Sequence, residues 1–457
     1  MGAFVHSDYW PIVVLVLSVA LVVILITKMR VHAFIALMLS AIFVGLLSPA
    51  LPIVPGQNPI ITVVELPMAE FGITAGKIGW VIALAAIIGT AMMESGAAEE
   101  IVNWLLRTLG EKRAAVALLI SGYILSIPVF FDTVFLLLIP LGITLALKTG
   151  KDFVLYVVAI AGGAAITHSI VPPTPGPLIM AETLNIPLGT VILAGIITGI
   201  LPAIAGLGVG KWLNRKMYIP VRMSEGHVTS VQNRPSLALS VLPVVVPIVM
   251  ISFTSTVEAL NGDVPAWIAF QGNKNIAMTV GAVIAVWLWT KTQKLGLKNL
   301  EEVIGKPLEV GGVIILITSA GGAYGAMINH SGIGDAIRVT TAGFDVHYII
   351  LAWMIASVMK IAQGSGTVSM ITASAIMAAL MGPDVRLPYH PIYILLSIGF
   401  GSMFISWMND SGFWVVTRMS GFTEKEGLKT WTFSLAIISM VGLLQVLLLS
   451  WIFPFIG

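Results

Sequence analysis

The sequence predicts an all-α polytopic membrane protein with about ten transmembrane helices and two re-entrant hairpins, arranged as two inverted repeats with interrupted helices. The first observation is composition, since 57% of the 457 residues are hydrophobic and 10% are charged, whereas soluble domains carry roughly 25% charged residues. The second is a series of apolar runs long enough to cross a bilayer, and the third is an internal repeat. So much apolar surface must face lipid, which excludes an ordinary cytosolic enzyme.

Charge and residue counts exclude further classes of protein. The formal net charge is +2 and there is no cysteine, so the chain has no basic field for nucleic acid, no disulfide and no thiolate metal site. The seven histidines lack zinc-site spacing. We therefore expect no metal, no cofactor and no nucleic-acid partner.

Ten apolar runs are candidate spans, because a helix crossing the hydrocarbon layer needs about 20 mostly apolar residues. In chain order they are Pro11–Thr27, Val31–Ser48, Ile78–Met93, Phe153–Ile170, Pro187–Gly208, Pro235–Ser252, Ile276–Thr290, Glu309–Ile328, Pro391–Met408 and Thr430–Phe453. The first run has no basic residue before Lys28, so it lacks the charged region of a cleaved signal peptide and is predicted to be a retained span.

Two longer apolar stretches, Ala114–Leu147 and Tyr348–Met381, are interrupted in the middle. The interruptions are Pro128–Thr133 (PVFFDT) and Gln363–Thr367 (QGSGT). Each stretch is either two full spans or a re-entrant hairpin with its tip near mid-membrane. Irregular backbone at that depth is tolerated only where it is buried or lines a cavity.

The distribution of basic residues favours the hairpins. With both stretches re-entrant, 19 of the 24 Lys and Arg residues fall in cytoplasmic segments, as the positive-inside rule requires. Those elsewhere are Lys77, Lys274, Arg338, Lys360 and Arg386. This topology places the N-terminus outside and a loop of residues 211–235 in the cytoplasm.

Two segments of the chain resemble each other. Ala91-Met92 matches Ala326-Met327, and Ser95-Gly96 matches Ser331-Gly332. After each segment come an interrupted apolar stretch and a span rich in small residues, and the predicted topology makes the two units inverted. Inverted repeats with interrupted helices indicate a secondary transporter with a site near the bilayer midplane.

Two polar breaks end the small-residue spans. His168–Pro177 (HSIVPPTPGP) holds four prolines that remove backbone donors, so the preceding helix must unwind beside His168, Ser169 and Thr174. The alternative is an ordinary proline-rich turn outside the membrane. Ser406–Gly412 (SWMNDSG) is the corresponding cluster in the second half, and two matching breaks favour one shared site.

The hairpin tips carry further candidates. Asp132 is an ionisable group deep in an apolar stretch, where such groups are costly and usually functional, so it is a candidate proton carrier or else a structural helix cap. The second tip offers hydroxyls and backbone amides suited to a carboxylate. Lys360, one turn earlier, either extends to the surface or pairs with a bound carboxylate.

The HSIVPPTPGP, FFDT, KxxQGSGT and SWMNDSGFW segments resemble the gluconate permease (gluconate:proton symporter) family, within the ion-transporter superfamily. The resemblance covers nearly the whole chain. It implies proton-coupled uptake of small hydroxylated carboxylates such as gluconate, related sugar acids, glycerate or D-serine. It also implies a bacterial inner-membrane homodimer with a scaffold and a moving transport domain. Asp132 and His168 compete as the proton carrier.

With this resemblance the expected division is residues 1–77 and 236–307 as scaffold spans, 78–210 and 308–457 as the two repeats, and 211–235 as the loop. The hypothesis is a symporter of a sugar acid and H⁺ with elevator-like alternating access. The expected substrate-binding residues are His168, Ser169, Thr174, Gly176, Lys360, Gly364, Ser365, Thr367, Asn409, Asp410 and Ser411.

Several alternatives remain at this level. A D-serine or glycerate transporter of the same family would use the same hydroxyl and amide groups, and the polar tips would also suit sodium coupling. A channel would carry currents faster than a carrier and would show no counterflow. An intramembrane protease has little support, because Ser169 follows His168 directly and adjacent residues do not face each other on a helix.

Overall fold

The computed structural model describes residues 10–48, 51, 58–222, 234–261, 263–296, 300–332, 336, 347–381 and 386–455. Within these residues the chain is helical and has no strand. Seven of the described helical segments are long and apolar enough to cross a membrane, and shorter apolar helices accompany them. The predicted all-α polytopic fold is confirmed. The N-terminal residues 1–9, residues 223–233 of the predicted loop and Arg338 lie outside the described residues.

The first half of the chain contains two opening helices and then one complete set of broken elements. The opening helices are α2 (Trp10–Thr27) and α3 (Ala33–Leu47). The set that follows consists of α4 (Pro59–Glu94), α5 (Ala97–Leu109), η1 (Glu111–Arg113), α6 (Ala114–Leu125), α7 (Phe131–Thr149), α8 (Phe153–Ile170), α9 (Pro175–Thr183), α10 (Leu188–Thr198) and α11 (Ile200–Lys216).

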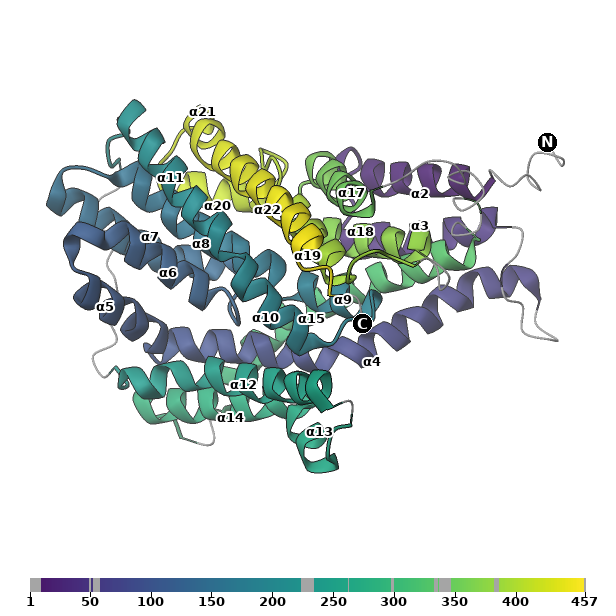
Figure 1. Cartoon of the computed structure of the whole chain (residues 1–457), viewed down its shortest axis with the longest axis horizontal. Helices are drawn as coiled ribbons and strands as arrows, with labels where there is room; N and C mark the ends of the chain where they lie inside the picture. The colour runs from purple at the N-terminus through teal and green to yellow at the C-terminus, as the bar shows by residue number, and fades with distance from the viewer. Residues whose placement is uncertain are drawn as a thin grey trace.

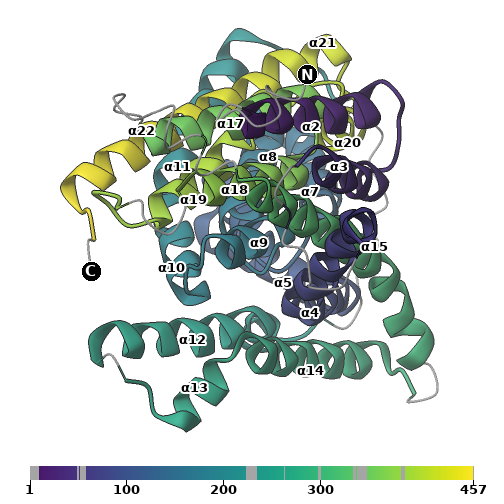
Figure 2. The same ribbon diagram turned by 90° about the vertical axis from the view of Figure 1, so that its right-hand side faces the viewer.

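A connecting group and a second set complete the chain. The connecting group is α12 (Leu237–Asn261), α13 (Ala266–Gly272) and α14 (Lys274–Gln293), which form an outlying layer beside α4 in both views (Figures 1 and 2). The second set is α15 (Leu300–His330), α17 (Tyr348–Gln363), α18 (Gly366–Met381), α19 (Ile392–Gly401), α20 (Ser411–Met419), α21 (Glu424–Gly427), the π-helical η3 (Leu428–Thr432) and α22 (Phe433–Ile452).

Both sets contain a long helix, a pair of helices joined by a break and a broken helix in the same order. Helix α4 packs along α15 with Gly311 against Ala83 and Gly322 against Thr74, so residue numbers rise along one helix as they fall along the other. Helices α4 and α15 are therefore antiparallel, as an inverted repeat requires. The broken helices of the two sets meet where Gly399 of α19 lies against the Ser169 carbonyl of α8.

Both interrupted stretches are hairpins of two helices. The arm α6 has 12 residues, and α17 and α18 have 16 each. At a rise of about 1.5 Å per residue these three arms reach roughly 18–24 Å, less than the ~30 Å of hydrocarbon, whereas α7, with 19 residues, is long and apolar enough to cross it. The second hairpin turns at Gly364, whose φ of +87° ends α17.

The long helices depart from the predicted spans for identifiable reasons. Helix α4 begins at Pro59, not near Ile78, because Asn58 caps it by accepting a hydrogen bond from the Ile60 amide at 3.0 Å. Charged residues in its first half lower the mean hydropathy there, so a search for apolar runs misses this part of the helix. The predicted run Pro187–Gly208 is divided at Gly199 and continues to Lys216. The expected divisions at residues 77/78 and 307/308 fall inside continuous helices.

Candidate functional site

The two hairpin tips and the two helix breaks surround one central cavity of about 400 Å³. Small-molecule sites typically occupy 300–1,000 Å³. One wall is formed by the α15 face that carries Ile314 and Thr318. The site predicted from the sequence is thus one place in the structure, and α15 is a wall that the sequence did not indicate.

Four described helices begin at this cavity. The first turns of α7, α9, α18 and α20 contribute lining residues, among them Thr133, Pro175, Thr367 and Ser411. The N-terminus of a helix carries free amide donors and roughly half a positive charge, although Pro175 and Pro177 leave α9 with few such donors and the Gly412 amide of α20 already donates to Asp410. Four such ends around one space make an environment that favours an anion.

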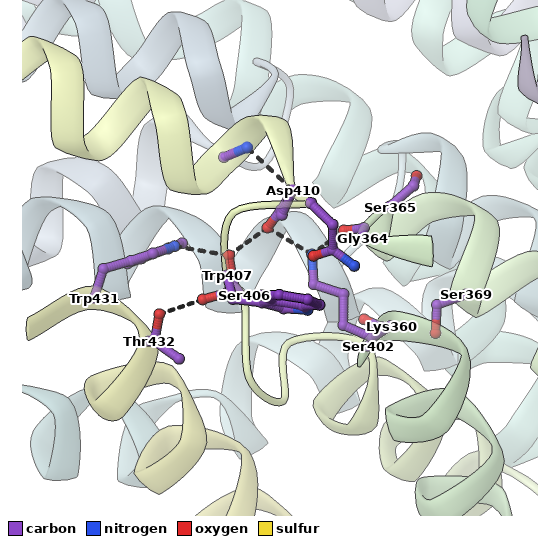
Figure 3. Close-up of polar contacts among 12 residues, drawn as sticks. Lys360, Gly364, Ser365, Ser369, Ser402, Ser406, Trp407, Asp410, Trp431 and Thr432 are labelled. Carbon is purple, nitrogen blue, oxygen red and sulfur yellow. Dashed lines mark hydrogen bonds and ion pairs between the residues drawn. The ribbon is translucent and has the colours of Figure 1, made fainter. Parts of the chain in front are cut away.

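Lys360 and Asp410 form a buried ion pair at the cavity. Their side chains are 2.7 Å apart, and the residues are 4% and 8% exposed. The Lys360 ammonium also donates to the Gly364 carbonyl at 2.5 Å. Figure 3 shows the ammonium between these two groups. Of the two interpretations open for Lys360, extension to the surface is wrong, and its partner in this structure is the Asp410 carboxylate.

The Asp410 carboxylate holds several elements together. It accepts hydrogen bonds from the Ser406 hydroxyl and, at 3.1 Å, from the Gly412 amide. The Trp431 indole donates to the Ser406 oxygen at 2.8 Å, as Figure 3 shows. Trp431 also stacks on Phe131 at the first hairpin tip, with ring centroids 5.4 Å apart. This network connects the tip of one hairpin to the tip of the other.

Asp132 and His168 also line the cavity. Among the described residues no donor or cation contacts the Asp132 carboxylate within hydrogen-bond or ion-pair distance. The Nδ1 atom of His168 is buried and has no hydrogen-bond partner there. Of the four ionisable residues on the described lining, Lys360 and Asp410 compensate each other and Asp132 does not have a countercharge.

Eight of the residues expected from the sequence lie on the cavity surface. They are Asp132, His168, Ser169, Lys360, Ser365, Thr367, Asp410 and Ser411. The structure adds Thr133, Thr318, Ser402 and Trp431 to the described lining. Thr133 could have been found beside Asp132, but Thr318 belongs to a span with no polar motif, and only the fold brings it here.

The other four expected residues lie behind the lining. The Thr174 hydroxyl donates to the carbonyls of Val171 at 2.7 Å and His168 at 3.0 Å, which ties the first break together. Asn409 donates to the Ile361 carbonyl at 2.8 Å. Gly364 lies so close to Asn409 that a Cβ would be 2.1 Å from its carbonyl oxygen.

Gly176, the last of these four, packs directly against Met370, since a Cβ on it would be 2.2 Å from the Met370 Cε. Among the described residues there is no group of three or more His, Asp or Glu side chains that could hold a metal ion. The chemistry available at the cavity is therefore binding by hydroxyls, amides and charges.

Comparison with known proteins gives matches over nearly the whole chain. The family described as GntP family permease matches residues 10–452. An "Uncharacterized permease" of Haemophilus influenzae is 34% identical, covering 97% of this chain and 93% of its own length. A "Gluconate permease" of Pseudomonas aeruginosa is 31% identical, covering 97% and 98%.

A solved structure of Neisseria gonorrhoeae MtrF, described as illuminating a class of antimetabolite efflux pumps, has a TM-score of 0.65 to this chain. It is 16% identical and covers 95% of this chain and 97% of its own. At that identity the likeness concerns the fold alone, and it agrees with a transporter architecture of this size.

Proposed function

The chain belongs to the GntP permease family and is a polytopic membrane permease, not an enzyme; from its central cavity we propose that it imports gluconate or a related small hydroxylated carboxylate together with a proton. The observation that carries the proposal is the meeting of four helix N-termini around one cavity. Those ends supply the positive potential for a carboxylate. Hydroxyls of Ser169, Ser365 and Thr367 supply partners for the hydroxyl groups of the substrate.

Proton coupling follows from the charges of the cavity. Lys360 is already compensated by Asp410 at 2.7 Å, so it contributes no net charge for an entering anion. The uncompensated Asp132 carboxylate would repel that anion at close range. A proton on Asp132 removes the repulsion, which makes anion entry and proton uptake favour each other. His168, on the same lining, is the competing carrier.

The proposed motion is elevator-like. The two hairpins and the broken helices would move together with the site, and α2, α3 and the α12–α14 layer would form the scaffold. The positive-inside distribution supports a bacterial inner-membrane orientation with the N-terminus outside. A homodimer stays a prediction from the family resemblance.

Uptake by purified protein in proteoliposomes tests the proposal. We expect a pH gradient that is acidic outside to drive labelled gluconate to an internal concentration above the external one. Asp132→Asn should abolish this uphill uptake. Asp152→Asn is the matched control, because that carboxylate lies at the start of α8 and accepts from Asn214 at 2.8 Å. Uptake that ignores the pH gradient, or uphill uptake by Asp132→Asn equal to the parent, contradicts the coupling.

The alternatives are distinguished in the same assay. Replacement of sodium by choline leaves uptake unchanged under proton coupling and stops it under sodium coupling. Unlabelled D-serine, glycerate and sugar acids in excess identify the preferred substrate by competition. If none of these acids competes and gluconate does not enter, the substrate class is wrong.

A further inference from the structure

A second cavity, of about 280 Å³, lies between α4, α9, α15 and α18. Its described lining includes Thr74, Lys77, Glu182 and Asn329. It shares no lining residue with the central cavity. Its lining therefore has no part in the substrate contacts argued above.

One face of α15 lines both cavities. Ile314 and Thr318 face the central cavity, and Gly321, Gly325 and Asn329 face the second. These positions recur at intervals of three or four residues, so they form one stripe along the helix. On α18 the change from one cavity to the other falls between two consecutive residues, Met370 and Ile371.

The layer that separates the cavities is thin and closely packed. A Cβ on Gly321 would lie 2.0 Å from the Ile371 Cγ2, and one on Gly325 would lie 2.4 Å from the Ala375 Cβ. Only glycine allows these two helices to approach so closely. Thr318 and Gly321 are three residues apart, about 4.5 Å along the helix axis. About one helical turn of packing thus divides the two spaces.

The contacts in this layer repeat along the helices. Ile371 sits against Gly321 and Ala375 against Gly325, so α15 and α18 run in the same direction with the same four-residue interval. A shift of α18 by four residues, about 6 Å, would move Ile371 into the space beside Gly325. One-turn shifts of this kind are a known form of transition between two packed states.

An ion pair at the edge of the second cavity connects the outlying α12–α14 layer to helix α9. Lys274, at the start of α14, pairs with Glu182 near the end of α9, and both side chains are partly exposed, at 21% and 25%. Helix α14 belongs to the outlying layer, whereas α9 continues the broken helix of the site. A motion of the site relative to that layer would have to break this pair.

We propose that the second cavity is the opposite mouth of the transport path, closed in this structure by the α15–α18 contact and latched by the Lys274–Glu182 ion pair. The inference rests on the proposed function. Besides Glu182, the charged groups on the described lining are Lys77 and Glu70, whose carboxylate the His330 ring contacts at 3.2 Å.

Cross-linking tests the latch, and the absence of cysteine from the natural sequence makes the chain a ready background. In Glu182→Cys/Lys274→Cys a short bifunctional methanethiosulfonate, which forms a disulfide with each cysteine, should reduce gluconate uptake at least tenfold, and a reductant should restore it. The matched control is Glu111→Cys/Lys148→Cys, an ion pair between η1 and α7 of one hairpin, which should keep its uptake when cross-linked. Parent-level uptake by cross-linked Glu182→Cys/Lys274→Cys overturns the proposal.

Labelling tests the path without reference to the substrate. Asn329→Cys reports on the second cavity and Thr318→Cys on the central one, each read by its rate of reaction with a maleimide. We expect reversal of the pH gradient to change the two rates in opposite directions after each is divided by the rate of a free thiol at the same pH, which removes the effect of pH on thiol ionisation. Rates that rise and fall together, or an Asn329→Cys rate that never changes, overturn the proposal. Failure of the unmodified chain to import any hydroxy acid, with opposed labelling rates intact, contradicts the proposed substrate and not the path.

Discussion

The Lys360–Asp410 ion pair provides the sharpest quantitative prediction, because each partner is almost completely removed from solvent. At 2.7 Å, an effective dielectric constant of about 20 gives an attraction of about 6 kcal/mol. The loss of hydration offsets much of that attraction. What the pair strongly resists is the loss of one partner, since the remaining charge stays buried without compensation.

We therefore expect Lys360→Met and Asp410→Leu each to lower the free energy of unfolding by about 3–5 kcal/mol. The double variant should be more stable than either single one, because no charge is left unpaired. Uptake should fail in all three, since the double variant restores the packing but not the polar wall of the cavity. Chemical unfolding in mixed micelles, followed by tryptophan fluorescence, measures the first effect and proteoliposome uptake the second.

The exposed Lys148–Glu111 pair is the control, with side chains 63% and 61% exposed. Lys148→Met should change stability little, because exposed pairs contribute little. The reasoning is refuted if the two buried single variants are as stable as the parent, or if their effects simply add in the double variant.

Two further substitutions address the hairpin tip and the indole network. Gly364→Ala should lower the free energy of unfolding more than Gly150→Ala does. Both glycines have positive φ, but only at Gly364 would the added Cβ meet a neighbour, Asn409. Equal losses in unfolding measurements would mean that backbone strain alone matters. Trp431→Phe should cost about 1–3 kcal/mol by leaving Ser406 without its 2.8 Å donor and should raise the KM for uptake. Trp353→Phe, which loses a similar 3.0 Å bond to Ser439, should affect stability alone, and a KM increase in both variants would contradict a specific role for Trp431.

The sequence predicts the broken elements well because their causes are local. Prolines also lie inside α4, α7, α12 and α15, but the four prolines that begin at Pro172 come within six residues and remove too many backbone donors for a helix to continue, and α8 ends at Ile170 as expected. Gly364 and its neighbours likewise end α17. The start of α4 is a contrasting case, since Glu65 and Glu70 interrupt the apolar pattern of its first half, and this part of the helix lies along α15 in the structure.

Pairings in space are harder to predict than breaks. Lys360 and Asp410 are separated by 50 positions, and no periodicity connects them. Thr174 and Asn409 belong to the right motifs, but the Thr174 hydroxyl and the Asn409 side-chain NH₂ group donate to backbone carbonyls. A motif therefore locates a site, whereas only the fold decides which of its members face the cavity.

The balance of charge in the central cavity has a consequence for energetics. The Lys360–Asp410 pair is neutral as a unit, so the empty site carries the single negative charge of Asp132. When one anion binds and Asp132 takes one proton, the negative charge passes from the protein to the substrate and the total is unchanged. Under the proposed elevator motion and proton coupling, the moving body would cross the membrane with the same charge loaded and empty, so its cycle would carry no net charge. A membrane potential imposed with valinomycin and potassium at equal pH should therefore leave gluconate uptake unchanged, and uptake driven by that potential alone would show that more than one proton accompanies each anion.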